Sequence, residues 1–247
     1  MKLFWRNKKN DPPAYFPPPD LAGEDGFLVE DTRIDRERLL DAYRHAIFPW
    51  PYREPESDWI VGWFSPDPRA VLKLDDLRVA KRLMRKLRSG RFRFSFNQSF
   101  ERVLHHCRTV GGREQEAWLM PRLVEELHGL HEEGTACSLE VYDVTDCSAS
   151  RLCGGVYGLS IGQVFCAESM FRLVPDASKA AIVVLVSILR QAGYRLVDIQ
   201  TPSPHMTQLG ATLISRGELQ RSLDRDSRRR ELTCWEHRNF FEWADLT

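Results

Sequence analysis

Several features that define whole classes of protein are missing from this sequence. Lys and Arg together number 35, as do Asp and Glu, so the formal net charge is zero. No global field attracts the chain to nucleic acid or to a membrane, and any such attraction must be local. The longest apolar run, Ala180–Val186, is far too short to span a bilayer. The N-terminal segment has no apolar core of signal-peptide length, so we expect a cytoplasmic protein without membrane attachment.

Metal-binding and nucleotide-binding patterns are missing as well. The six cysteines show no CxxC spacing. His105, His106 and Cys107 are consecutive, so their side chains would point apart on a helix. We therefore expect free thiols in a reducing compartment and no metal site. The chain also has no Gly-rich pyrophosphate loop of the form R/Q-x-x-G-x-G/A, which argues against a CoA-dependent enzyme.

The stretch Gly154–Phe171 has the pattern of a β-hairpin. Two short apolar strands, Gly155–Leu159 and Gln163–Phe171, are joined by a Gly-bounded turn at Ser160–Gly162. The second strand places Glu168 among apolar neighbours, where a buried charge is costly unless it meets a partner or a substrate. Residue type alone leaves two interpretations open: a functional carboxylate, or an edge glutamate that points to solvent.

The residues after the hairpin indicate a crossover. The pattern predicts a helix at Ala177–Gln191 and then a strand at Tyr194–Gln200. A helical crossover favours a last strand that is parallel to the second strand of the hairpin. Glu168, Asp198 and Gln200 would then converge at the ends of neighbouring strands, a common position for sites in α/β sheets.

One motif within the hairpin is misleading. Gly158–Gly162 matches GxSxG, the nucleophile elbow of many hydrolases. That elbow requires a strand, a sharp turn and then a helix. Here a second strand follows, so we interpret Ser160 as a turn residue and do not favour a serine hydrolase.

The N-terminal quarter is rich in Pro and aromatic residues. An extended Pro-rich arm at Asn10–Pro19 precedes a helix predicted at about Asp35–Ala46. The Pro and Gly content of the next segment predicts a loop, although aromatic side chains crowd it: Trp50, Tyr52, Trp59, Trp63 and Phe64. Such residues either stack on a nucleobase or cap a core, and the residues alone favour core capping.

A run of cations carries the clearest electrostatic signal. Its members recur at helical spacing opposite an apolar stripe, and no acidic residue lies between Asp76 and Glu101. The run comprises Arg78, Lys81, Arg82, Arg85, Lys86 and Arg88. One interpretation of this run is a helix face that is simply exposed to solvent and has no binding role. In a chain of zero net charge, a run of one sign favours phosphate binding, and an RNA backbone fits.

Six short motifs occur in the order of a known family: FPW at 48–50, SPDPR at 65–69, FCAESMF at 165–171, DASK at 176–179, VDIQ at 197–200 and LGA at 209–211. With them the chain resembles the leucyl/phenylalanyl-tRNA–protein transferase family from about Phe16 to Leu223. The resemblance departs from the family at Ala46, where the family has Gly, and at Ala117, where it commonly has Thr. Ala167 is a third departure.

The resemblance implies a set of site residues. It puts Asp198 and Gln200 at the reacting amine, with Asp198 orienting Gln200, and Glu168 nearby to hold the ammonium or the substrate. Trp50 and Trp118 would stack on the terminal adenosine of the aminoacyl-tRNA. The aminoacyl pocket would be lined by Val156, Phe165, Met170, Ile182, Leu185 and Val197, and the basic run would bind the tRNA acceptor arm.

The resemblance also implies a fold. It is an α/β mixed-sheet sandwich of the N-acetyltransferase type, with a small N-terminal domain at 1–64 that includes the Pro-rich arm. The catalytic domain would cover 65–223. A tail at 224–247 falls outside the resemblance, and its aromatic residues dock either on the body or on a partner.

The function implied is transfer of Leu or Phe from aminoacyl-tRNA to the N-terminal α-amine of proteins that begin with Arg or Lys. Such transfer marks those proteins for N-degron degradation. The ester is already activated, so no ATP, metal or cofactor is required. We expect a monomer. Two alternatives stay open: another N-acyltransferase of the same fold, and a non-catalytic tRNA-binding protein.

Overall fold

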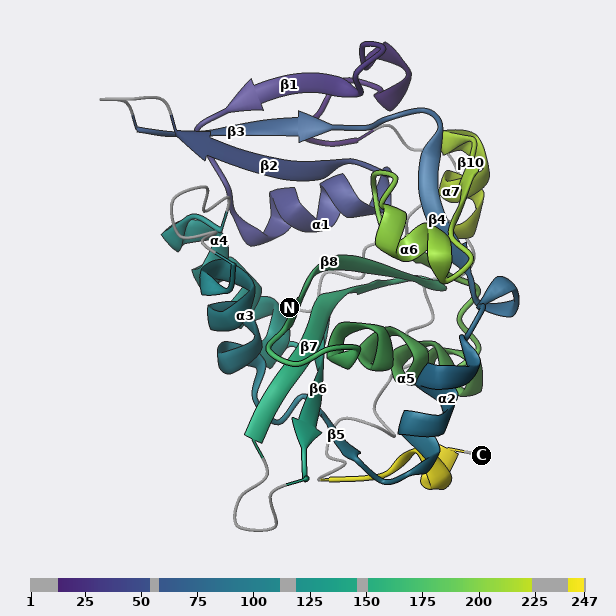
Figure 1. Ribbon diagram of the computed structural model, residues 1–247. Coiled ribbons are helices and arrows are strands. Elements are labelled where there is room, and N and C mark those ends of the chain that lie inside the picture. The colour runs from purple at the N-terminus through teal and green to yellow at the C-terminus, as the bar shows by residue number, and fades with distance from the viewer. Residues whose placement is uncertain (1–12, 54–57, 112–118, 146–150, 224–239, 247) are drawn as a thin grey trace, which may run out of the picture.

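In the computed structural model the chain is a mixed α/β protein with two sheets (Figure 1). The structure describes residues 13–53, 58–111, 119–145, 151–223 and 240–246. Three antiparallel strands form the smaller sheet in the order β1 (Phe27–Asp31), β3 (Trp59–Phe64), β2 (Phe48–Arg53). The α/β class predicted from the sequence is confirmed.

The larger sheet has seven strands, with β8 and β9 near its middle. Their order is β10 (Thr212–Ile214), β4 (Arg69–Lys73), β9 (Leu196–Asp198), β8 (Val164–Arg172), β7 (Arg151–Ile161), β6 (Ala136–Asp143) and β5 (Phe92–Phe96). The pair β8–β9 is parallel, and the other described pairs are antiparallel. This sheet is the scaffold on which the helices pack.

Helices cover the seven-stranded sheet on both faces (Figure 1). One face packs against α5 (Ala177–Gln191) and α2 (Lys81–Arg88). The other packs against α1 (Arg36–Arg44), α3 (Phe100–Thr109) and α4 (Pro121–Glu132). Two short helices, α6 (Pro204–Gln208) and α7 (Arg216–Leu223), flank the β4–β10 edge. Among the described residues no helix is both long and apolar enough to cross a bilayer.

The hairpin and crossover predicted from the sequence are confirmed. β7 and β8 pair antiparallel around a turn at Gly162 and Gln163. β7 is longer than predicted, and β8 has the predicted length but begins and ends one residue later. The predicted helix over 177–191 is α5, and β9 returns parallel to β8 with Asp198 beside Cys166. Ser160 lies within β7, so its assignment to the turn was wrong, because the strand runs on to Ile161. A second strand and not a helix follows the turn, so the GxSxG match is not an elbow.

The loop predicted for the aromatic segment is wrong, because much of it forms the strands β2 and β3. Pro49 and Pro51 misled the prediction, since Pro removes a donor from a β-ladder. β2 is an edge strand that pairs on one side with β3, and such a strand tolerates Pro. Trp63 is fully buried, which agrees with core capping, whereas Trp50 is 51% exposed.

The end of the chain docks on the body. Phe94 and Phe241 exchange two backbone hydrogen bonds, so Phe241 continues the β5 edge of the large sheet. The last described turn, Trp243–Leu246, packs near α2 and α5. The tail segment 224–239 lies outside the described residues.

Candidate active site

A buried ion pair joins β4 to its neighbour β9, the strand that pairs with β8. Arg69 on β4 donates from Nε to Oδ1 of Asp198 at 2.9 Å and from Nη2 to Oδ2 at 2.8 Å. Both side chains belong to residues that are only 1% exposed. A bidentate, charge-assisted pair of this kind has a fixed geometry, so it holds Asp198 in one orientation.

The same guanidinium also reaches the N-terminal region. Arg69 Nη1 donates to the carbonyl of Ala46 at 3.0 Å, and the group lies 4.7 Å from the Phe48 ring centroid. Ser65 Oγ donates to the same carbonyl. Ala46 has φ of +61°, a left-handed conformation that favours Gly. The departure at Ala46 therefore lies at a backbone position that presents its carbonyl to Arg69.

Gln200 connects Asp198 to Glu168. Its backbone N–H donates to Asp198 Oδ1 at 3.0 Å, and its side-chain Nε2 donates to Glu168 Oε1 at 2.9 Å. Gln200 also has a positive φ of +59°, so the chain turns sharply just after β9. The three residues that the sequence predicted to converge do so, with Asp198 bonded to the Gln200 backbone and not to its amide.

A β-bulge aims Glu168 at this cluster. Tyr157 pairs with Ser169 and Gly158 with Ala167, so Glu168 has no partner on β7. Bulges turn a side chain out of the regular alternation and are frequent at active sites. Gly158 opposite the bulge is required by space, because a Cβ there would lie 2.1 Å from the Cys166 carbonyl oxygen.

The carboxyl of Glu168 is held close to its titration point. Burial raises the pKa of Glu168 to about 8, and a hydrogen bond from Tyr43 on α1 acts in the opposite direction by stabilising the charged form. Burial and the neighbouring carboxylate raise the pKa of Tyr43 well above its ordinary value, so the phenol stays a donor. By contrast, both oxygens of Asp198 already accept N–H bonds.

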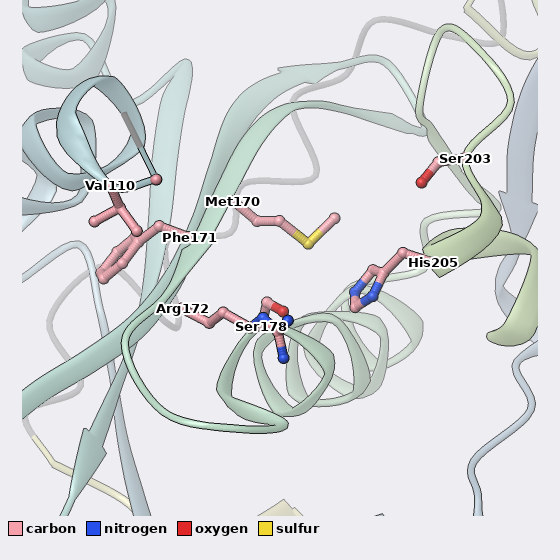
Figure 2. Close-up of a pocket in the computed structure, with 8 residues that line it drawn as sticks. Val110, Met170, Phe171, Arg172, Ser178, Ser203 and His205 are labelled. Atoms are coloured by element: carbon pink, nitrogen blue, oxygen red, sulfur yellow. The ribbon is translucent and has the colours of Figure 1, made fainter. Parts of the chain in front are cut away.

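A cleft of about 510 Å³ lies beside the cluster (Figure 2). Met170, two residues beyond Glu168 on β8, lines it together with residues of the segment that follows Gln200. The described residues that line it are Val110, Gly111, Met170, Phe171, Arg172, Ser178, Ser203 and His205. In Figure 2 the side chains of Met170 and His205 approach the same space from opposite sides. A small apolar group with polar neighbours fits such a cleft.

The predicted aminoacyl-pocket residues gather on the α5 face of the sheet. Met170 lines the cleft and is partly buried. The other members lie in the core behind it, each at most 1% exposed: Val156, Phe165, Ile182, Leu185 and Val197. Of the two predicted stacking residues, Trp50 is exposed on β2 and Trp118 lies outside the described residues.

The predicted basic helix is α2, and most of its cations face solvent. The exposed ones are Arg78, just before the helix, and Lys81, Arg82, Arg85 and Arg88. Lys86 forms an ion pair with Asp176, which precedes α5, and this pair lowers the pKa of Asp176. Ser178, in the first turn of α5, lines the cleft. The ion pair therefore fixes the basic face relative to the cleft.

Two members of the cluster were not predicted as site residues. Arg69 ends the SPDPR motif, and Tyr43 lies on the inward face of the predicted N-terminal helix. A signal for Arg69 did exist, because an Arg at the start of an apolar strand needs a counter-charge when it is buried. For Tyr43 the sequence held no sign that its hydroxyl would meet a carboxylate.

The ion pair predicts a strong energetic coupling. Arg69→Met and Asp198→Asn should each lower the free energy of unfolding by about 3–5 kcal/mol, because either change leaves a buried charge unpaired. The double variant should cost clearly less than the sum, as measured by urea denaturation. Lys73→Met is the matched control on β4, since Lys73 pairs with Glu218 at the surface and should cost about 0–1 kcal/mol. Additive single effects at Arg69 and Asp198 would contradict the coupling.

Comparison with known proteins identifies the family of the chain. The sequence model of the leucyl/phenylalanyl-tRNA protein transferase family matches residues 71–224, and that of its N-terminal domain matches residues 32–67. Similar proteins carry the name leucyl/phenylalanyl-tRNA–protein transferase. The protein of Shewanella piezotolerans is 41% identical over 81% of this chain and 82% of its own length. The protein of Hydrogenovibrio crunogenus is 40% identical over 86% of this chain and 80% of its own length. The protein of Christiangramia forsetii is 39% identical over 84% of this chain and 95% of its own length. The chain belongs to the leucyl/phenylalanyl-tRNA protein transferase family.

Proposed function

We propose that this protein transfers Leu or Phe from aminoacyl-tRNA to the α-amine of an acceptor protein that begins with Arg or Lys. The observation that carries the proposal is the Tyr43–Glu168–Gln200–Asp198 cluster at the bulge of β8 and the end of β9, beside an open cleft. Family membership supplies the reaction class. N-degron marking of the acceptor, action in the cytoplasm and action as a monomer belong to the same proposal.

The proposed architecture is an N-acetyltransferase-like domain at 65–223 with a small N-terminal domain at 1–64. Two observations support it. The three-stranded sheet ends at Phe64 and the seven-stranded sheet begins at Arg69. The parallel pair β8–β9 lies within a sheet of antiparallel pairs, with the site at its end. The two units share one core, since Trp63 and Tyr43 pack in the same cluster as Tyr157.

In the proposed reaction the acceptor amine attacks the ester carbonyl, the new C–N bond forms, and the ester C–O bond to the ribose breaks. The ammonium must first lose a proton. Glu168 has a pKa of about 8, and an α-ammonium has one of about 7.7–8.0, so the transfer between them costs little free energy. Glu168 later releases this first proton to solvent. The nitrogen loses a second proton as the C–N bond forms, and that proton passes to the departing ribose oxygen, so the products are an amide and a free hydroxyl. Asp198 is the fixed counter-ion that shapes the turn, and Gln200 positions Glu168.

The donor end of the tRNA would occupy the cleft. The aminoacyl side chain would pack against Met170, with the core residues on the α5 face behind it. Trp50, which is 51% exposed, is the first residue proposed to stack on the terminal adenosine, and Trp118 is the second. The exposed cations of α2 would neutralise phosphates of the acceptor arm.

A transfer assay tests the proposal. Labelled Phe or Leu should pass from its tRNA to a peptide that begins with Arg or Lys, without ATP or CoA. A peptide whose N-terminus is acetylated is the control and should accept no label, because it has no free α-amine. Equal labelling of the acetylated peptide would exclude attack by the α-amine. Turnover of acetyl-CoA without tRNA would favour another N-acyltransferase, and tRNA binding without transfer would favour a non-catalytic protein.

The basic face of α2 predicts a separable binding defect. Arg82→Ala with Arg85→Ala should weaken tRNA binding and make its salt dependence shallower by up to about two phosphate contacts. Transfer at saturating tRNA should stay near normal, because neither residue reaches the cluster. Arg33→Ala with Arg122→Ala removes two exposed charges from other elements and is the control. An equal loss in both double variants would show that net charge, not α2, attracts the tRNA.

The contact between Tyr43 and Glu168 predicts a shift in pH dependence. Tyr43→Phe removes the hydrogen bond that stabilises the carboxylate, so the pKa of Glu168 rises further, by up to about one unit. Because the carboxylate is the form that accepts the proton, the rising limb of the transfer rate should move to higher pH. Single-turnover rates with saturating Phe-tRNA measure it, and the acceptor amine titrates alike in both proteins.

Tyr52→Phe is the matched control for that shift. Tyr52 bonds to the exposed Glu30 on the small sheet, away from the cluster. Loss of the Tyr52 hydroxyl should leave the pH dependence of the transfer rate unchanged. An unshifted profile for Tyr43→Phe would remove Glu168 from the role of proton acceptor.

A further inference from the structure

His205 is a polar residue of the cleft that the proposed reaction does not yet use. It lies in α6, five residues beyond Gln200, and its ring faces the cleft opposite Met170 (Figure 2). Its Nε2 atom is buried and has no hydrogen-bond partner among the described residues. A buried polar atom without a partner is costly, and in native proteins it commonly meets water or a ligand.

The surroundings of His205 keep the imidazole neutral. Burial lowers its pKa, and two nearby cations, Lys179 on α5 and Arg172 at the end of β8, lower it further. Lys179 is itself held by Gln208 on α6 through a bond of 2.9 Å. Ser178 and Ser203, also in the lining, carry no charge. A neutral imidazole offers one donor and one acceptor, which suits a hydroxyl better than an ion.

The charge of the cleft decides which substrate it admits. Among the described residues that line it, none carries a carboxylate, and Arg172 adds a positive charge. An acceptor with an N-terminal Arg or Lys would be repelled there, whereas the ribose–phosphate end of a tRNA would be attracted. That end also carries a free 2′-hydroxyl next to the aminoacyl ester, and this group can donate and accept a hydrogen bond.

We infer that His205 binds the 2′-hydroxyl of the terminal adenosine of the donor tRNA and thereby orients the ester toward Glu168 and Gln200. The inference rests on the proposed function, because it assigns the cleft to the donor. It adds a substrate-binding residue whose contribution depends on one hydroxyl group of the ligand. A purely structural role for His205 would not depend on that hydroxyl.

The test compares two uncharged tRNAs that differ only in a terminal adenosine or 2′-deoxyadenosine. Wild-type protein should bind the deoxy form more weakly by roughly 3- to 10-fold, the range for one neutral hydrogen bond. His205→Ala should bind the ribose form as weakly as the wild-type protein binds the deoxy form, and its affinities for the two tRNAs should be equal. His205→Gln fills the space and offers an amide near the place of Nε2, so it should regain part of the discrimination.

His105→Ala is the matched control, because His105 is an exposed histidine of α3 outside the cleft lining. It should keep the wild-type discrimination. Equal weakening of both tRNAs by His205→Ala, or no discrimination by wild-type protein, would overturn the assignment. If wild-type protein bound neither tRNA, the proposed function itself would fail, so the two failures are distinguishable.

Discussion

The ion pair between Arg69 and Asp198 is the constraint on which the rest of the site depends. One guanidinium holds β4 against β9, donates a third hydrogen bond to the Ala46 carbonyl and lies against Phe48. The small sheet and the large sheet are thereby tied at one buried point. Replacing such pairs with apolar residues is often neutral or stabilising, so stability alone does not explain this one. Its effect is geometric: it fixes the carboxylate that bonds the Gln200 backbone and so sets the turn after β9.

Two departures from regular strand geometry then position the side chains of Glu168 and Gln200. The bulge in β8 directs Glu168 toward Tyr43 and Gln200, while Phe165 and Ala167 stay in the core under α5. The positive φ of Gln200 turns its amide back toward Glu168. One face of the sheet therefore carries the polar cluster, and the other supplies the apolar packing. Each carboxylate has a distinct environment, because Asp198 is neutralised by a cation and Glu168 is not.

The sequence predicted those parts of the fold that are encoded by local patterns of residues. The periodicity of 177–191 and the turn residues around it predicted the hairpin, the helix and the parallel return strand, and with them the convergence of Glu168, Asp198 and Gln200. It failed at β2, because Pro in a strand is permitted only by an edge position that the sequence does not reveal. Arg69 was missed because its partner lies 129 positions away. The pKa of Glu168 depends on burial under α1, a contact that no local pattern encodes.

The zero net charge of the chain hides a strong local separation of charge. Exposed cations of α2, together with Arg172 and Lys179, surround the start of α5, where the cleft opens. Asp176 joins this region through its ion pair with Lys86, and it has a left-handed φ of +76° just before α5. Glu168, with its carboxyl near its titration point, lies two residues from Met170 on the same strand, and Met170 lines the cleft. The proposed polyanionic donor and cationic acceptor need opposite fields within one site. Two residues span about 7 Å of a strand, which is within the screening distance of about 8–10 Å, so both fields can act on one reacting ester.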